Sequence, residues 1–197
     1  MNSLTRLSLA PALLLCLMLG ACGSTPHSNY YRLSAVSDGG SGVTPAIGIG
    51  PVEIPQYLNR NSMVFMRDDN QLHIASFERW AEPLQAGITR VLGLNLAGAL
   101  DTQNIRPFPW RGSDIPDYGV QLWLLALDAK PGGTRLVAAW RVYKPASGGE
   151  VMRRIGRYQG AGSDIDGAAI SSAFSRMLAQ LSDDIASAIR EDMTGNE

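Results

Sequence analysis

Residues 118–128 read Tyr-Gly-Val-Gln-Leu-Trp-Leu-Leu-Ala-Leu-Asp. Apolar residues stand at odd and at even positions, so both faces of the predicted strand are apolar, as is typical of a strand in the middle of a sheet. A turn at 130–133 follows. The next strand, at 135–143, alternates between an apolar face and a face that carries arginine. A third strand at 151–159 completes a meander. One face of the second strand carries Leu136, Ala138, Trp140 and Val142, and the other carries Arg135 and Arg141.

Two amphipathic helices are predicted, one before and one after this meander. The first begins at Trp80 or Pro83 and ends near Leu100, and Pro83 suits the first turn because a missing N–H costs nothing there. The second begins near Asp164 or Asp166, either of which would cap it favourably. Apolar residues recur at helical spacing in both segments: Leu84, Ile88, Val91, Leu92, Leu96, Ala99 and Leu100 in the first, and Ile170, Phe174, Met177, Leu178, Leu181, Ile185 and Ile189 in the second.

Shorter strands are predicted on the amino-terminal side of the first helix. They cover residues 30–33, residues 46–55, and a hairpin whose strands are 63–66 and 72–75. The order is strands, helix, strands, helix, and two amphipathic helices can cover one face of one sheet. We therefore predict an α+β fold with a single mixed or antiparallel sheet and two long amphipathic helices packed on one of its faces.

Pro51 lies inside the strand predicted at 46–55. Proline cannot donate a hydrogen bond to a neighbouring strand, so this strand should bend or form a sheet edge there. Gly48 and Gly50 fall on one face of the same strand. They leave that face bare, so that another backbone or side chain can approach it closely.

The amino-terminal region has the organisation of a lipoprotein signal peptide. Its apolar run at 7–19 is too short for a membrane span, which needs roughly 20 residues. The run ends in Leu19-Gly20-Ala21-Cys22, which resembles the bacterial lipobox. The resemblance implies that the signal peptidase recognises Leu19, Gly20 and Ala21, and that Cys22 is lipidated with acyl chains such as palmitate. The alternative is an ordinary secretory signal that is cut elsewhere and leaves Cys22 free.

Lipidation makes residues 22–29 a polar tether that reaches roughly 25 Å when extended. The predicted organisation is a signal peptide at 1–21, the tether at 22–29, one domain at 30–191 and a polar tail at 192–197. Each buried methylene contributes about 0.8 kcal/mol, so several acyl chains together anchor a protein permanently. Gly23 follows the cysteine where lipoproteins retained at the inner membrane carry aspartate. By that rule we expect the periplasmic leaflet of the outer membrane.

The composition excludes several classes of function. A net charge of −1 gives no electrostatic basis for binding nucleic acid. Cys16 leaves with the signal peptide and Cys22 is lipidated, so the mature chain has no thiol for a disulfide, a metal or a nucleophile. His27 in the tether and His73 in the hairpin stand alone, and the sequence has no catalytic or phosphate-binding motif. We expect no enzymatic activity, no catalytic residue, no metal site and no cofactor.

Four short motifs make the chain similar to a known family. Residues 30–33 read Tyr-Tyr-Arg-Leu, residues 49–60 contain Gly-Pro-Val and then Tyr-Leu-Asn-Arg, and residues 79–84 read Arg-Trp-Ala-Glu-Pro-Leu. In this order, and after a lipobox, they resemble the PqiC-type ABC-transport auxiliary lipoprotein family. The similarity is most specific between residues 47 and 100. The matching residues there are Pro51, Tyr57, Leu58, Arg60, Arg79, Trp80, Glu82 and Pro83.

The resemblance implies a non-enzymatic subunit of an intermembrane lipid transport system. In such systems an MCE-domain protein forms a tunnel across the periplasm. The lipoprotein would hold the distal end of that tunnel at the outer membrane and support the integrity of the envelope. The implied partners are the MCE-domain tunnel protein and, through the lipid, the outer membrane. A homo-oligomeric ring that matches a ring-shaped partner is a further hypothesis.

The sequence leaves two questions open. Arg79, Trp80 and Glu82 either contact a partner or form the corner at the start of the helix, with Trp80 buried and Arg79 near a carboxylate. The chain is either an adaptor or, as the alternative, a periplasmic lipid carrier that holds an acyl chain between the helices and the sheet.

Overall fold

The computed structural model describes residues 27–68, 70–160 and 166–195. The predicted signal peptide, the lipobox with Cys22, and the tether up to residue 26 lie outside the described residues, as does Asp164. Within the described ranges, neither helix combines the length and the apolarity needed to span a bilayer.

A five-stranded sheet forms the body of the molecule, in the order β5-β2-β6-β7-β8. The meander is confirmed, because β6 pairs with β7 and β7 with β8 in antiparallel register, while β2 runs parallel to both β5 and β6. The sheet is therefore mixed, as predicted. Its strands are β2 (Ile47–Glu53), β5 (Ile105–Pro107), β6 (Tyr118–Lys130), β7 (Gly133–Lys144) and β8 (Gly149–Gly160).

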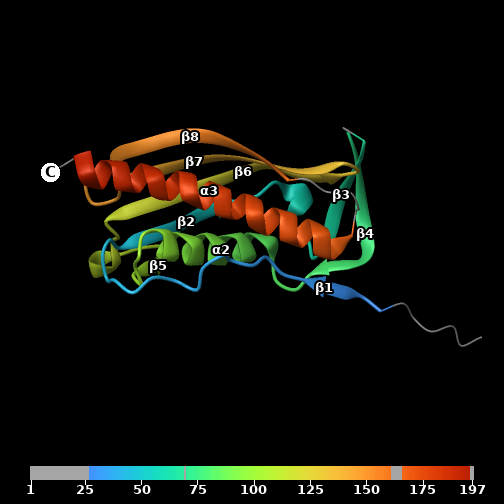
Figure 1. Cartoon of the computed structure of the whole chain (residues 1–197), viewed down its shortest axis with the longest axis horizontal. Coiled ribbons are helices and arrows are strands. Elements are labelled where there is room, and N and C mark those ends of the chain that lie inside the picture. Colours follow the sequence, from blue (N-terminus) through green and yellow to red (C-terminus); the bar gives the residue numbers. More distant parts are fainter. Residues whose placement is uncertain (1–26, 69, 161–165, 196–197) are drawn as a thin grey trace, which may run out of the picture.

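A second sheet of three strands contradicts the prediction of a single sheet. It consists of β1 (Asn29–Tyr31), β3 (Ser62–Asp68) and β4 (Gln71–Trp80), in the order β1-β4-β3. The 3-10 helix η1 (Gln56–Leu58) redirects the chain after β2, and the hairpin then stands at one end of the long axis (Figure 1). There β3 lies against β6 without pairing with it. Alternation of residues predicts the strands correctly but does not say which of them share a ladder.

Two helices cover one face of the five-stranded sheet, as predicted (Figure 1). They are α2 (Leu84–Ala99) and α3 (Gly167–Gly195), and they also pack on each other. Trp80 is the last residue of β4 and not a helical residue, and Pro83 immediately precedes α2. At the start of α3, the Ala169 N–H donates to Asp166 Oδ1 at 2.7 Å, the capping contact predicted for that aspartate. The core between helices and sheet contains Leu92, Leu122, Leu136, Trp140 and Leu181, each at most 1% exposed.

The carboxyl-terminal end of α3 departs from the prediction of a polar tail at 192–197. The helix continues to Gly195, and Asp192 belongs to it. The Tyr118 hydroxyl donates to Asp192 Oδ2 at 2.8 Å, and Lys144 Nζ lies 2.7 Å from the same oxygen. These contacts to β6 and β7 extend the helix beyond the point where its apolar stripe ends.

The bare face of β2 is covered by aromatic side chains from the loop after β5. A Cβ atom on Gly48 would lie 2.3 Å from the Trp110 ring, and one on Gly50 would lie 2.8 Å from Phe108. The prediction of a close approach at the two glycines is confirmed. The strand is also irregular at Pro51, because its pairing with β5 ends at Ile49 and its register with β6 shifts between Ile49 and Val52.

Replacing Gly48 by alanine should lower the free energy of unfolding by about 1–3 kcal/mol, because the added methyl group collides with the Trp110 ring. Denaturation in urea, followed by circular dichroism, measures the change. Gly195→Ala is the control, since a Cβ there meets nothing within 4 Å. Equal stability of Gly48→Ala and the unmodified protein would contradict the close approach of this loop.

Removal of the Tyr118 hydroxyl should change how stability depends on pH. Burial, followed by the hydrogen bond to Asp192, raises the pKa of Tyr118 from 10.0 to about 12. A raised tyrosine pKa means that its contribution to stability is complete below pH 10 and is lost as the pH rises through about 12. The stability advantage over Tyr118→Phe should therefore be constant near pH 8 and shrink between pH 10 and 12. An advantage that does not change over this range, measured by urea denaturation, would refute the assignment.

Candidate functional site

The motifs that the sequence singles out meet at one corner, where β4 ends and α2 begins. Tyr30 pairs with Arg79 and Tyr31 with Trp80, since β1 runs parallel to the end of β4. The Trp80 N–H donates to the Asn61 carbonyl at 2.6 Å, which places the segment after Arg60 beside the same residues. The four motifs, far apart in sequence, thus build one local structure. We call it the tether junction, because β1 is the first strand after the predicted tether.

The Gly-Pro-Val motif reaches the same corner through α2. Gln85 Nε2 in the first turn of α2 donates to the Val52 carbonyl at 2.6 Å. Pro51 precedes that carbonyl, at the irregular part of β2 where β5 no longer pairs. The first turn of α2 is therefore fixed to β2 as well as to the end of β4.

Trp80 forms the buried part of the tether junction. Its side chain is 6% exposed, and its ring stacks on Phe174 of α3, with 6.4 Å between the ring centroids and an angle of 27° between the planes. The Ala81 N–H, one residue later, donates to the Tyr31 carbonyl at 2.7 Å. Burial of an aromatic ring against α3 makes Trp80 a packing residue and not a surface contact.

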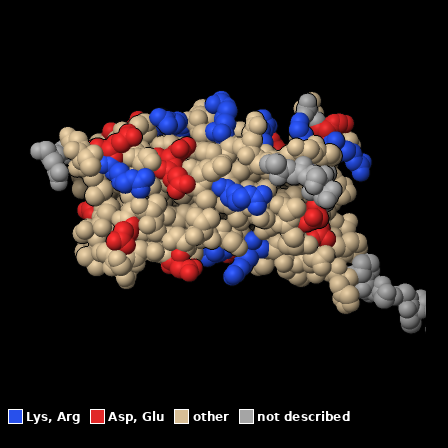
Figure 2. Space-filling view, in the orientation of Figure 1, with Lys and Arg blue, Asp and Glu red and all other residues tan. Residues whose placement is uncertain are grey.

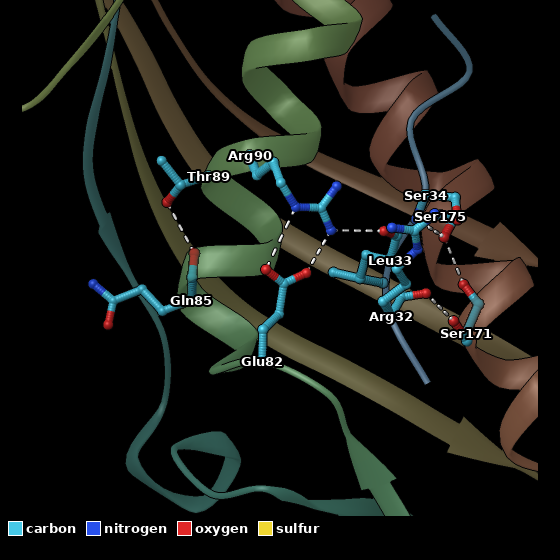
Figure 3. Close-up of polar contacts among 9 residues, drawn as sticks. All are labelled: Arg32, Leu33, Ser34, Glu82, Gln85, Thr89, Arg90, Ser171 and Ser175. Carbon is cyan, nitrogen blue, oxygen red and sulfur yellow. Dashed lines mark hydrogen bonds and ion pairs between the residues drawn. The ribbon is translucent and has the colours of Figure 1, made fainter. Parts of the chain in front are cut away.

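Glu82 is held by an arginine that the family motif does not include. The guanidinium of Arg90 in α2 pairs with both carboxylate oxygens of Glu82, and Arg90 Nη2 also donates to the Leu33 carbonyl at 2.9 Å (Figure 3). Gly87 leaves room for this arrangement, because a Cβ there would lie 3.2 Å from Glu82 Oε1. The carboxylate of Glu82 therefore serves to orient Arg90, and Arg90 binds the chain that arrives from the tether.

Residues 32–36, which we call the strap, cross α2 and α3 after β1. The strap alternates like a strand: Leu33 is 1% exposed and Ala35 is half-buried against the core, whereas Arg32, Ser34 and Val36 are exposed. The middle of a helix has no free backbone groups to pair with a crossing segment. The backbone of the strap must therefore find its hydrogen bonds on side chains.

Four side chains of the two helices supply these hydrogen bonds. Ser171 Oγ donates to the Arg32 carbonyl at 2.6 Å, and the Ser34 N–H donates to Ser175 Oγ at 3.0 Å (Figure 3). The Val36 N–H donates to Asn95 Oδ1 at 2.9 Å, and Arg90 binds the Leu33 carbonyl as described. The strap is thus bound through four backbone groups. They are the carbonyls of Arg32 and Leu33 and the N–H groups of Ser34 and Val36.

These four residues could not be identified from the motifs of the sequence. Arg90, Asn95, Ser171 and Ser175 are absent from the motifs and lie within segments that were interpreted only as apolar stripes. A signal was present, because Ser171, Ser175 and Ser182 recur on the buried side of α3 and Asn95 is only 3% exposed. Small polar residues on an apolar helix face indicate a buried polar partner from another part of the chain.

The remaining motif residues divide between interior and surface. Leu58 is 4% exposed, and Arg60 Nε donates to the Tyr57 carbonyl at 2.9 Å. Burial raises the pKa of Tyr57. The side chains of Arg60 and Pro83 are exposed, and that of Arg79 is half-exposed. Because Glu82 is turned toward Arg90, it is not the carboxylate expected beside Arg79.

The described residues contain no cluster of the kind that holds a metal ion. Within residues 27–68, 70–160 and 166–195, no three His, Cys, Asp or Glu side chains gather closely enough to hold a metal ion. His73 of β4 stacks on Phe65 of β3, with 6.2 Å between the ring centroids, and His27 is exposed.

Comparisons with known proteins agree with this architecture. The model of a family described as the ABC-type transport auxiliary lipoprotein component matches residues 31–186. No curated protein matches this chain. An uncharacterized protein of known structure has 19% sequence identity and a TM-score of 0.69, covering 83% of this chain and 99% of its own. Protein XCC0632 from Xanthomonas campestris, of family DUF330, has 10% identity and a TM-score of 0.70, covering 86% and 100%. At these identities the two structures show a shared fold.

Loss of one strap contact should loosen the strap without unfolding the domain. In Ser175→Ala the Ser34 N–H loses its acceptor, a loss worth about 0.5–1.5 kcal/mol. Hydrogen exchange of the Ser34 amide should accelerate about two- to tenfold. Ser172→Ala is the matched control, because Ser172 is exposed on α3 and its Oγ accepts from Arg176. If both variants exchange at the rate of the unmodified protein, the strap is not held by Ser175.

Proposed function

The chain belongs to the family of ABC-type transport auxiliary lipoprotein components, and we propose that it anchors an intermembrane lipid transport system at the outer membrane. In this proposal Cys22 carries the lipid, the domain faces the periplasm, and the partner is an MCE-domain protein whose tunnel crosses the periplasm. The lipoprotein holds the distal end of that tunnel and contributes to the integrity of the envelope. It performs no chemical reaction.

One observation carries the proposal: the motif residues build an attachment between the tether and the domain. Trp80, Glu82 and Arg90 fix β1 and the strap to β4 and to both helices. An enzyme would concentrate reactive groups in a cleft, whereas this chain concentrates buried contacts at the point where a membrane anchor would join the domain. This arrangement supports a function that depends on the position at which the domain is held at the membrane.

A short tether has a direct consequence for binding. Six residues separate Cys22 from Asn29, so the first strand stays within roughly 25 Å of the lipidated cysteine. A partner that reaches this layer meets the domain at a high effective concentration without any additional contact.

The tether junction divides the motif residues into two groups with different roles. Trp80 and Glu82 are used within the protein, which supports the structural interpretation for them. Arg60 and Arg79 remain accessible at the same corner, and we assign them to the contact with the tunnel protein. A homo-oligomeric ring belongs to the same proposal, since β8 is an edge strand of the large sheet and a ring would match a ring-shaped tunnel.

The surface charge gives no support to a nucleic-acid partner. Figure 2 shows basic and acidic side chains interspersed over one face, with no extended area of one sign. Charged side chains pair locally in several places, as Arg135 does with Asp128 at 2.7 Å and Arg153 with Glu150 at 2.7 Å. A surface of this kind suits a protein partner or the zwitterionic surface of a membrane.

The lipid-carrier alternative is not favoured by the interior of the molecule. The space between helices and sheet, where an acyl chain would lie, is occupied by side chains such as Ile88, Leu122 and Ile185, all fully buried. A hollow of about 510 Å³ lies instead at the end of β6 and β7, where Asp128, Lys130 and Arg135 are among its lining residues. Charged walls do not suit an acyl chain.

The proposal is tested by capture of the tunnel protein from cells that express both partners. The full lipidated chain, tagged at its carboxyl terminus, should recover the MCE-domain protein of the same transport system. The double variant Arg60→Glu, Arg79→Glu should recover at least tenfold less. Arg111→Glu, which changes an exposed arginine in the loop after β5, is the control and should recover the usual amount.

Two outcomes would contradict the proposal. Failure of the unmodified chain to recover an MCE-domain protein, with both expressed, would remove the assigned partner. Mass spectrometry of the mature chain should show acyl groups on Cys22, and a mature chain without them would remove the anchor. A chain in which an ordinary cleavable secretory signal replaces residues 1–22 should fold normally and appear in the soluble periplasmic fraction.

A further inference from the structure

The β3–β4 hairpin exposes apolar side chains that the described chain does not cover. Leu72 is 42% exposed, Ile74 47% and Phe77 43%, and Tyr30 of the neighbouring strand β1 is 65% exposed. Because β1 pairs only with Glu78–Trp80, β4 has an open edge over residues 71–77. We call Tyr30, Leu72, Ile74 and Phe77 the hairpin patch.

The hairpin patch lies beside the point where the tether joins the domain. Asn29, the first residue of β1, pairs with Glu78, and its Nδ2 donates to Glu78 Oε1 at 3.0 Å. Phe77 is next to Glu78 in β4, and Leu72 is five residues further along, roughly 17 Å at the rise of a strand. In Figure 1 β1 and the hairpin occupy the same end of the long axis, and the carboxyl-terminal end of α3 lies at the opposite end.

The length of the tether brings this end of the molecule to the membrane. Asn29 stays within roughly 25 Å of the lipidated Cys22, so the patch is within reach of the surface that holds the lipid. Other exposed apolar side chains lie elsewhere, such as Leu125 on β6 and Ile155 on β8, in the outer face of the large sheet. The patch thus differs from them in its place relative to the anchor.

The size and composition of the hairpin patch favour a lipid surface over a protein partner. Four partly exposed side chains offer a few hundred Å², whereas a stable protein interface buries about 800 Å² on each partner. A small patch is sufficient on a membrane to which the protein is already attached, because the second contact is intramolecular. Tyr30, with an apolar ring and a polar hydroxyl, suits the mixed environment of lipid headgroups.

We propose that the hairpin patch inserts into the headgroup region of the bilayer that carries the lipid anchor. The domain then touches its membrane at two places, the lipidated cysteine and the hairpin, and this fixes the orientation of the long axis relative to the bilayer. The inference rests on the lipid anchoring assigned under the proposed function.

A fluorescent probe on the patch tests the inference. The sequence has two cysteines, Cys16 and Cys22; the first leaves with the signal peptide and the second is acylated, so an introduced cysteine is the single free thiol. The lipidated variants Ile74→Cys and Leu72→Cys are labelled with NBD and reconstituted into phosphatidylethanolamine/phosphatidylglycerol vesicles that contain spin-labelled lipid. We expect a blue-shifted emission and at least threefold stronger quenching than for the control.

The control variant is Ile155→Cys, labelled and reconstituted in the same way. Ile155 matches Ile74 in residue type and in exposure, 47% for both, but it lies on β8 in the large sheet. Its probe should emit as in water and show weak quenching. The comparison therefore separates contact at the hairpin from mere attachment of the protein to the vesicle.

Flotation of the vesicles separates the two proposals. If the protein does not float with the vesicles, the lipid anchor fails and the proposed function fails with it. If the protein floats but the probes at Ile74 and Ile155 are quenched equally, the anchor stands and the hairpin contact is refuted. Shielding of the Ile74 probe that appears only when the tunnel protein is added, or only as the protein density rises, would also refute it, since the patch would then bind protein.

Discussion

The arrangement of the amino-terminal segment depends on one constraint: a polypeptide that crosses two helices needs partners for its backbone N–H and C=O groups. Arg90, Ser171, Ser175 and Asn95 provide them from the sides of α2 and α3. Leu33 adds an apolar contact to the core at the centre of the crossing. Glu82 and Trp80 contribute indirectly. Glu82 orients Arg90, and Trp80 fixes the end of β4 against α3. The motif residues Trp80 and Glu82 thus help to attach the amino-terminal segment to the domain.

The fold could be predicted from the sequence to the level of its elements. The meander, the hairpin and both helices follow from local periodicity, and Gly48 with Pro51 correctly indicates the bare and irregular part of β2. The division into two sheets was missed, because the turn of the chain after β2 depends on packing that no local pattern reports. The tail beyond Asp192 was missed for a similar reason, since Tyr118 and Lys144, distant in sequence, hold the end of α3.

The candidate site was predictable only in part. Trp80 could be placed from its motif, but its partner Phe174 lies 94 positions later, and Ser171 lies 139 positions after the carbonyl it binds. Contacts of this span depend on which helix faces the segment, so they follow from the three-dimensional arrangement alone. The polar residues on the buried side of α3 were the available signal. This concentration of internal contacts supports the positioning role that we propose for the domain.

The parallel pairing of β1 with β4 has a mechanical consequence. A pull transmitted through the tether acts on Asn29 along the axis of β1, and the hydrogen bonds between the two strands lie across that axis. Such bonds are loaded in shear, so they share the force and must break together, whereas bonds pulled open from one end of a ladder break one at a time. Beyond Tyr31 the strap adds its own bonds to the resistance. The domain is therefore joined to its tether in a geometry that resists traction along β1.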